Sequence, residues 1–177
     1  MVDLSLPEFQ IRELTNGPDL EPIYALRVTA WRTRLNLSTD VQRWKDPEDQ
    51  SARHWAIYNN QGLLAAAARM SVHERRTEVP EAEIYLSLLD SVPTPICSLN
   101  RCVVHPDFRG RGLSSLLDSV RVVAAADAGC KSVIVAVDEP LRKRHLVSQG
   151  FRVLGEALPY SAGILKGVSN SIYIINP

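Results

Sequence analysis

The 177-residue sequence has few cysteines and no net charge, and each shortage excludes a class of protein. Three cysteines cannot all pair with one another, and none belongs to a CxxC pair or a cysteine–histidine cluster, which argues against a disulfide framework and a zinc site. The 20 basic and 20 acidic side chains cancel, whereas a nucleic-acid binder needs a broadly basic surface. We therefore expect neither a metal nor a nucleic-acid partner.

Long apolar runs are missing as well. The longest, such as Leu63 to Ala68, fall far short of the roughly 20 residues that a membrane-spanning helix needs. The N-terminal residues carry acids and lack the apolar core of a secretory signal. Apolar and charged residues make up an ordinary 45% and 23% of the chain. These features predict one continuous cytoplasmic domain over residues 1–177, with no membrane partner.

Apolar periodicity predicts alternating strands and helices. The expected strands with both ends defined cover residues 9–14, 54–58, 63–70, 97–104, 132–137 and 171–175. One further strand is expected to begin at Phe151, and another to lie near Ile164. The expected helices run from residues 17–19 to Trp31, from 113 to a cap at Gly129, and from 140 to 149. Residues 71–95 are expected to form a long loop with one helical turn. The order strand, helix, strand predicts a parallel pair in a mixed sheet, and hence an α/β (α+β) fold.

Residues 109–114, Arg-Gly-Arg-Gly-Leu-Ser, stand between a predicted strand and a predicted amphipathic helix. The first N–H groups of a helix have no acceptor within the helix, and they lie at the positive end of its dipole. Together with Arg109 and Arg111, they predict a site for a phosphate or pyrophosphate. The alternative is a glycine turn whose arginines are solvated. A mononucleotide-binding fold is a poor fit, because the lysine of GxxxxGK[ST] and the third glycine of GxGxxG are both missing.

The stretch from Cys102 to Leu113, CVVHPDFRGRGL, resembles the acyl-CoA-binding motif of the GNAT acyltransferase superfamily, and Gly150-Phe151 is similar to the pair that closes the family's next helix. The resemblance implies a GNAT-like mixed, mostly antiparallel twisted sheet with a splayed central parallel strand pair, flanked by helices. It also implies acetyl-CoA as the acyl donor, its pantetheine arm along the strand and its pyrophosphate on the turn. The cofactor-binding residues that it implies are Cys102, Val103, Val104, Arg109, Gly110, Arg111, Gly112, Leu113 and Ser114.

The sequence departs from the family pattern at the acid and base positions. The tyrosine that many members carry four residues before Gly150 is Leu146 here, and the glutamate common on the fourth strand, expected at residues 97–104, falls on Ser98. The remaining catalytic candidates are Glu139 at the end of a predicted strand, His145 beside the tyrosine position, and Tyr85 in the long loop. Each has an ordinary structural alternative: an acid near a helix N-terminus that the helix dipole favours, a solvated or structural histidine, and a partly buried, packed tyrosine.

The resemblance implies an N-acetyltransferase that moves an acetyl group from acetyl-CoA to a primary amine of a small molecule or amino acid, by direct attack in a ternary complex. Two alternatives stay open. One is a long-chain N-acyl amino acid or acyl-homoserine-lactone-type synthase that uses acyl carrier protein. The sequence is similar to such synthases at Arg69 and at Leu99-Asn100-Arg101. The other is a non-catalytic CoA-binding module. The expected partners are acyl-CoA and a small amine, or acyl carrier protein under the first alternative, and a homodimer is left open.

Overall fold

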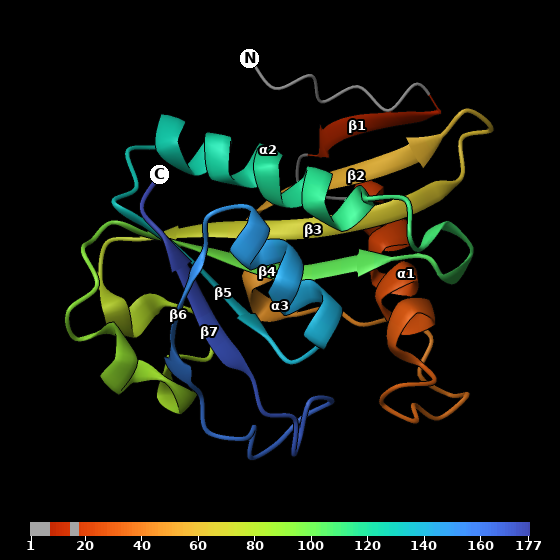
Figure 1. Ribbon diagram of the computed structural model, residues 1–177. Coiled ribbons are helices and arrows are strands. Elements are labelled where there is room, and N and C mark those ends of the chain that lie inside the picture. Colours follow the sequence, from red (N-terminus) through yellow and green to blue (C-terminus); the bar gives the residue numbers. More distant parts are fainter. Residues whose placement is uncertain (1–7, 15–17) are drawn as a thin grey trace. The chain divides into compact units, whose positions relative to one another are not determined.

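The computed structural model describes residues 8–14 and 18–177. Within these ranges seven strands form one mixed sheet in the order β1-β2-β3-β4-β5-β7-β6, with β4 and β5 parallel (Figure 1). The strands are β1 Phe9–Leu14, β2 Arg53–Asn59, β3 Leu64–His73, β4 Ile96–Val104, β5 Ser132–Val137, β6 Arg152–Glu156 and β7 Ser171–Ile175. The helices are α1 Glu21–Trp31, α2 Leu113–Asp127 and α3 Pro140–Ser148. The predicted mixed sheet with a central parallel pair and flanking helices is confirmed.

Two segments differ from the prediction. In the predicted loop of residues 71–95, β3 continues to His73, and 3-10 turns follow at Arg76–Glu78, Ala82–Ile84 and Leu86–Leu89. The strand predicted near Ile164 is wrong, because that residue lies in a turn that Gly163 and Gly167 close with positive φ angles of 74° and 82°. Before α1, residues 18–20 form a 3-10 turn, and the helix start predicted at residue 17 lies outside the described residues.

By its internal contacts the chain divides into two compact units. Unit 1 comprises Met1–Arg69 and Arg101–Asp118, and unit 2 comprises Met70–Asn100 and Ser119–Pro177. Each unit has its own apolar cluster. A single domain over residues 1–177 therefore stays a prediction. None of the helices in the described part of the chain is long and apolar enough to cross a membrane.

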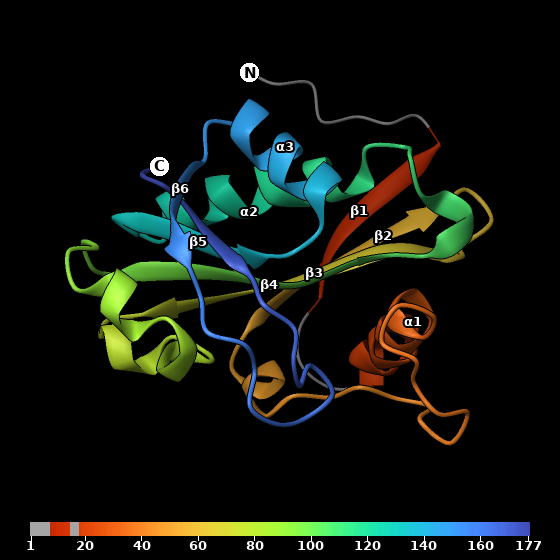
Figure 2. The ribbon, with the colours of Figure 1, turned by 60° about the horizontal axis from the view of Figure 1, so that its bottom comes forward.

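The apolar cluster of unit 1 joins α1 to the sheet. Ile23 and Leu26 of α1 pack with Ala56 of β2 and Ala67 of β3. The run Ala65–Ala68 in β3 is almost completely buried. Since alanine adds only a methyl group to the face of a strand, a helix can approach the backbone closely there. Figure 2 shows α1 lying along this part of the sheet.

Unit 2 is organised by the alternation of side chains in β7. Ile172 and Ile174 join the 3-10 turns in a cluster that includes Leu89. Because successive strand residues point to opposite faces, Ser171 points away from that cluster, and its hydroxyl meets Lys143 of α3. Residues 133–137 of β5 pair with the whole length of β7. The β-branched residues of β5 are as expected for a strand buried on both faces.

Candidate active site

The predicted phosphate-binding turn lies entirely in unit 1. After β4, the His105 N–H donates to the carbonyl of Ala65 at 2.8 Å, and a 3-10 turn follows at Pro106–Phe108. Gly110 and Gly112 then adopt φ angles of 77° and 76°, in the left-handed region that favours glycine. A Cβ built on either glycine would meet no heavy atom within 4 Å. The glycines are therefore required by the backbone conformation and not by crowding from the protein itself.

The start of α2 supplies the hydrogen-bond donors of this turn. The Leu116 N–H donates to Gly112 O at 3.0 Å. The N–H groups of Leu113 and Ser114 come before this bond, so the helix itself has no carbonyl acceptor for them. They lie at the positive end of a 15-residue helix. This arrangement is suited to an anion such as a pyrophosphate.

The two arginines of the turn have different surroundings. Arg109 donates from Nη2 to the carbonyl of Ala30 near the C-terminal end of α1, at 2.8 Å. The Arg111 side chain is half exposed, 3.4 Å from the carboxylate of Glu8, which is itself exposed. Such a surface ion pair contributes little energy. Arg111 is thus the arginine that an incoming anion can recruit at low cost, whereas Arg109 ties the turn to α1.

The strand β4 changes character halfway along its length. It pairs with β5 from Ile96 to Leu99 and then continues to Val104. Arg101, just beyond these pairs, has a φ angle of 50°, which is unusual for a residue other than glycine. Val103 is buried in the cluster of unit 1, while Cys102 and Val104 are partly exposed.

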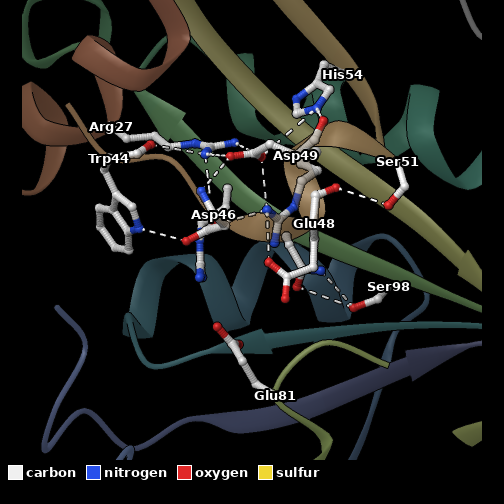
Figure 3. A network of polar contacts seen from close by, with 12 residues as sticks. Arg27, Trp44, Asp46, Glu48, Asp49, Ser51, His54, Glu81 and Ser98 are labelled. Carbon is white, nitrogen blue, oxygen red and sulfur yellow. Dashed lines mark hydrogen bonds and ion pairs between the residues drawn. The ribbon is translucent and has the colours of Figure 1, made fainter. Parts of the chain in front are cut away.

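A group of largely buried charges in unit 1, which we call the arginine–aspartate cluster, joins α1 to the 3-10 turn Pro47–Gln50 and to β3 and β4 (Figure 3). It consists of Arg27, Asp46, Asp49, Arg69 and Arg101. Both Asp49 oxygens accept hydrogen bonds from Arg27, at 2.7 and 2.8 Å, and Arg69 donates to Asp49 at 2.9 Å and to Asp46 at 3.0 Å. Arg101 pairs with Asp46 and lies over the ring of Trp44.

The arginines keep both carboxylates of the cluster ionised. Burial disfavours the charged form of Asp49, but the hydrogen bond and charge of Arg27 more than offset it and hold the pKa of Asp49 well below its usual range. Burial likewise opposes the ionisation of Asp46, and Arg101 and Arg69 lower its pKa. Carboxylates held this tightly are poor proton acceptors. The cluster is therefore better suited to holding the backbone in place than to acid–base chemistry.

His54 completes the surroundings of Asp49. Its Nε2 lies 3.0 Å from the Asp49 carbonyl, so Nε2 carries the proton and donates it. Burial lowers the pKa of this histidine, which the hydrogen bond only partly counteracts. His54 is consequently neutral and uncharged at neutral pH, and it adds no positive charge to the cluster.

The three predicted catalytic residues all lie in unit 2. Glu139 accepts hydrogen bonds from the N–H groups of Leu141 and Arg142, so it caps α3. Tyr85 is buried and its hydroxyl donates to the carbonyl of Pro80. His145 is exposed on α3. Their ordinary structural roles are thus visible, and their catalytic roles stay predictions.

The two positions at which the sequence departs from the family pattern are both buried. Leu146 has no exposed surface, and Ser98 is 2% exposed. The Ser98 hydroxyl accepts a hydrogen bond from the side-chain amide of Asn100 at 3.0 Å. Neither position offers an acid or a base, so any proton transfer must use other groups.

Sequence reasoning missed the arginine–aspartate cluster. Its one local signal is the sequence Asp46-Pro47-Glu48-Asp49. Here Asp46 and Asp49, three residues apart, form a reciprocal capping pair at the start of a 3-10 turn. The two arginine partners of Asp49 lie 20 and 22 positions away in the chain, and no local pattern predicts such pairs.

The family is established by comparison with known proteins. The model of the acetyltransferase (GNAT) family matches residues 20–151, well over half of the chain. The chain therefore belongs to the GNAT acetyltransferase family. Membership implies an acyl-CoA donor and an acceptor substrate, and it makes the protein an acyltransferase. No relative among the curated proteins matches the chain.

Solved structures support the same fold. An N-acyl amino acid synthase, FeeM, from uncultured soil microbes is 11% identical, with 97% of this chain and 91% of that chain covered and a TM-score of 0.72. A putative N-acetyltransferase from Lactobacillus plantarum is 19% identical, with 96% and 98% covered and a TM-score of 0.65. Arylalkylamine N-acetyltransferase 2 from Aedes aegypti is 15% identical, with 94% and 99% covered and a TM-score of 0.65. At these identities the likeness concerns the fold alone.

Proposed function

We propose that this protein transfers an acetyl group from acetyl-CoA to a primary amine of a small molecule or an amino acid, by direct attack in a ternary complex. The observation that carries the proposal is the turn before α2, where Gly110 and Gly112 adopt left-handed conformations and the N-terminal N–H groups of the helix follow. This geometry suits the pyrophosphate of CoA. Family membership supplies the reaction class.

Different groups of the predicted cofactor residues bind different parts of acetyl-CoA. The N–H groups of residues 110–114 hold the pyrophosphate, with Arg111 adding charge, while the Arg109 N–H donates to the Pro106 carbonyl. The backbone of Cys102 and Val104 pairs with the pantetheine amides as an added strand would. A backbone N–H near Val103 stabilises the oxyanion formed when the amine attacks the thioester carbonyl. No acyl-enzyme is needed, because the amine attacks the donor directly.

Two measurements test this function. CoA is expected to raise the melting temperature of the wild-type protein, since a ligand that binds only the folded state stabilises it. A panel of amines incubated with acetyl-CoA is expected to release free thiol above the background rate for at least one amine. Stabilisation by CoA without turnover on any amine would instead support the non-catalytic binding module. Absence of stabilisation would contradict both.

Gly112→Val tests the turn directly. We expect CoA affinity to fall about 5- to 30-fold, because a β-branched residue disfavours the left-handed conformation by about 1–2 kcal/mol. Gly163→Val is the matched control: its φ angle is 74°, it also has no heavy atom near its Cβ position, and it lies in a turn of unit 2. Titration calorimetry with CoA compares them. Equal losses of affinity in both variants would contradict the assignment.

A second function has a specific observation in its favour. Of the three structures described above, FeeM, an N-acyl amino acid synthase, has the highest TM-score. The second function is a long-chain N-acyl amino acid synthase that takes its acyl group from acyl carrier protein, and this likeness in fold is the observation that supports it. Native mass spectrometry of the purified protein distinguishes the donors, because co-purified CoA supports the first function and a bound fatty acyl chain supports the second. Turnover with acetyl-CoA but not with a long-chain acyl carrier protein would contradict the second.

A further inference from the structure

Two of the three cysteines meet inside unit 2. Cys97 is the second residue of β4, and Cys130 lies between the end of α2 and the start of β5. Both are in the reduced, thiol form, and a hydrogen bond joins their side chains. The third cysteine, Cys102, belongs to unit 1. We refer to Cys97 and Cys130 as the thiol pair, and the proposed acyl transfer does not use either of them.

The pairing of β4 with β5 explains why these two residues meet. The register of this parallel pair places Cys97 opposite Val133, three residues after Cys130. Just before the paired residues, the Lys131 N–H donates to the Pro95 carbonyl at 2.9 Å. Each cysteine is therefore within two residues of a backbone hydrogen bond that holds the two chain segments side by side.

The C-terminal end of α2 fixes the backbone of Cys130 as well. The Cys130 N–H donates to the Ala125 carbonyl at 3.0 Å, and the Gly129 N–H donates to the Ala126 carbonyl at 2.9 Å. Gly129 has a φ angle of 75°, so these bonds form a Schellman motif. Because backbone hydrogen bonds already hold the thiol pair in contact, little conformational entropy is left to lose when the two sulfurs are joined.

The surroundings of the thiol pair favour reaction at Cys130. The hydrogen bond with Cys97 lowers the pKa of Cys130 from 9.0 to about 7, although burial and the charge of Glu74 both act to raise it. About half of this thiol is therefore ionised at neutral pH, and the thiolate is the reactive form. Cys130 is 5% exposed, whereas Cys97 has no exposed surface. A small oxidant consequently reaches Cys130 first, and Cys97 lies behind it.

We propose that the thiol pair is a redox modification site, at which a peroxide joins Cys97 and Cys130 in a disulfide. The Cys130 thiolate attacks one oxygen of hydrogen peroxide, the O–O bond breaks, and the departing hydroxide takes a proton to become water. Cys130 is then a sulfenic acid. The Cys97 sulfur attacks the Cys130 sulfur, the S–O bond breaks, and a second water leaves with the proton of Cys97. One peroxide is reduced to two waters, and two thiols are oxidised to one disulfide.

The disulfide should also change the stability of the protein. It closes a loop of the chain that contains the whole stretch 102–114, and a closed loop restricts the unfolded chain. We expect the oxidised protein to melt about 4 °C or more above the reduced protein. An unchanged or lower melting temperature of the disulfide form would overturn the inference that the folded chain holds the two thiols ready to be joined.

The wild-type protein provides the direct test. Hydrogen peroxide is expected to lower the number of thiols titrated after unfolding from three to one, and dithiothreitol is expected to restore them. Trypsin separates the three cysteines into the peptides 77–101, 102–109 and 122–131. Mass spectrometry of the unreduced digest should show 77–101 joined to 122–131. A link to 102–109, a sulfinic acid at Cys130 without any link, or three remaining thiols would overturn the proposal.

Two variants separate a reactive pair from two packed thiols. Cys102→Ala is the matched control, and peroxide should still remove both of its thiols. Cys97→Ala should form no disulfide within the chain, and iodoacetamide at pH 7 should label Cys130 about fivefold more slowly than in the wild type. The thiolate fraction falls as the pKa returns toward its ordinary value, and the greater nucleophilicity of each thiolate offsets part of that fall. Equal labelling rates would overturn the activation of Cys130 by Cys97.

This inference does not depend on the proposed function. Thiol counts, peptide links and labelling rates are measured without CoA or an amine. A protein that forms the disulfide but neither binds CoA nor acetylates an amine would overturn the proposed function alone. A protein that acetylates an amine but keeps three thiols in peroxide would overturn the redox site alone.

Discussion

Asp49→Asn is expected to lower the free energy of unfolding by about 3–5 kcal/mol, the usual cost of breaking a buried ion pair from one side. The Asp49 carboxylate accepts four hydrogen bonds, two from Arg27, one from Arg69 and one from the Asp46 N–H. An asparagine amide would turn an NH₂ group toward some of these donors. It would also leave the buried Arg27 charge without its carboxylate. Urea unfolding followed by circular dichroism measures the loss.

The matched control for this substitution is an ion pair at the surface. Glu21 pairs with Arg43 at 2.6 Å, and both side chains are more than half exposed. Glu21→Gln should therefore change the free energy of unfolding by no more than about 1 kcal/mol. If the two substitutions cost the same, the arginine–aspartate cluster does not stabilise unit 1 in the way that its burial indicates.

The strands were predicted best where the pattern of apolar and β-branched residues lies within the strand itself. β1, β5 and β7 have the predicted bounds because alternation or continuous apolar runs define them without reference to distant residues. The same reasoning assigned a strand near Ile164, but Ile164 and Leu165 stand between two glycines in a segment that forms a turn. It also ended β3 at Met70, because the polar residues that follow hide the continuation of the strand to His73.

The candidate site divides in the same way. The turn of residues 109–114 could be predicted, because glycines, arginines and a helix start are adjacent in the chain. The arginine–aspartate cluster could not, because it joins residues that lie far apart in the chain. The bond between Arg27 and Asp49 spans 22 positions, and the bond between Arg101 and Asp46 spans 55. Read locally, each of these charges looks like a solvated surface residue.

The arginine–aspartate cluster should also make folding sensitive to acid. The pKa values of Asp46 and Asp49 are lowered in the folded state from about 3.8, so the unfolded chain binds more protons than the folded one at low pH. The stabilisation is therefore complete above about pH 5 and is lost as pH falls through the lower pKa values of the folded state. Each such carboxylate contributes a slope of about 1.4 kcal/mol per pH unit in that window, and two contribute about 2.7.

The measurement is the free energy of unfolding in urea at pH values from 5 down to 3, where we expect the wild-type protein to lose stability steeply. Asp46→Asn removes one of the two titrating groups and should flatten this curve. Glu13→Gln is the control, because Arg53 lowers the pKa of Glu13 as well, yet that pair is nearly half exposed and contributes little. A curve that Asp46→Asn leaves as steep as the wild type would mean that acid sensitivity arises outside the cluster. A curve flattened equally by Glu13→Gln would mean that surface pairs, and not buried charges, set the pH dependence.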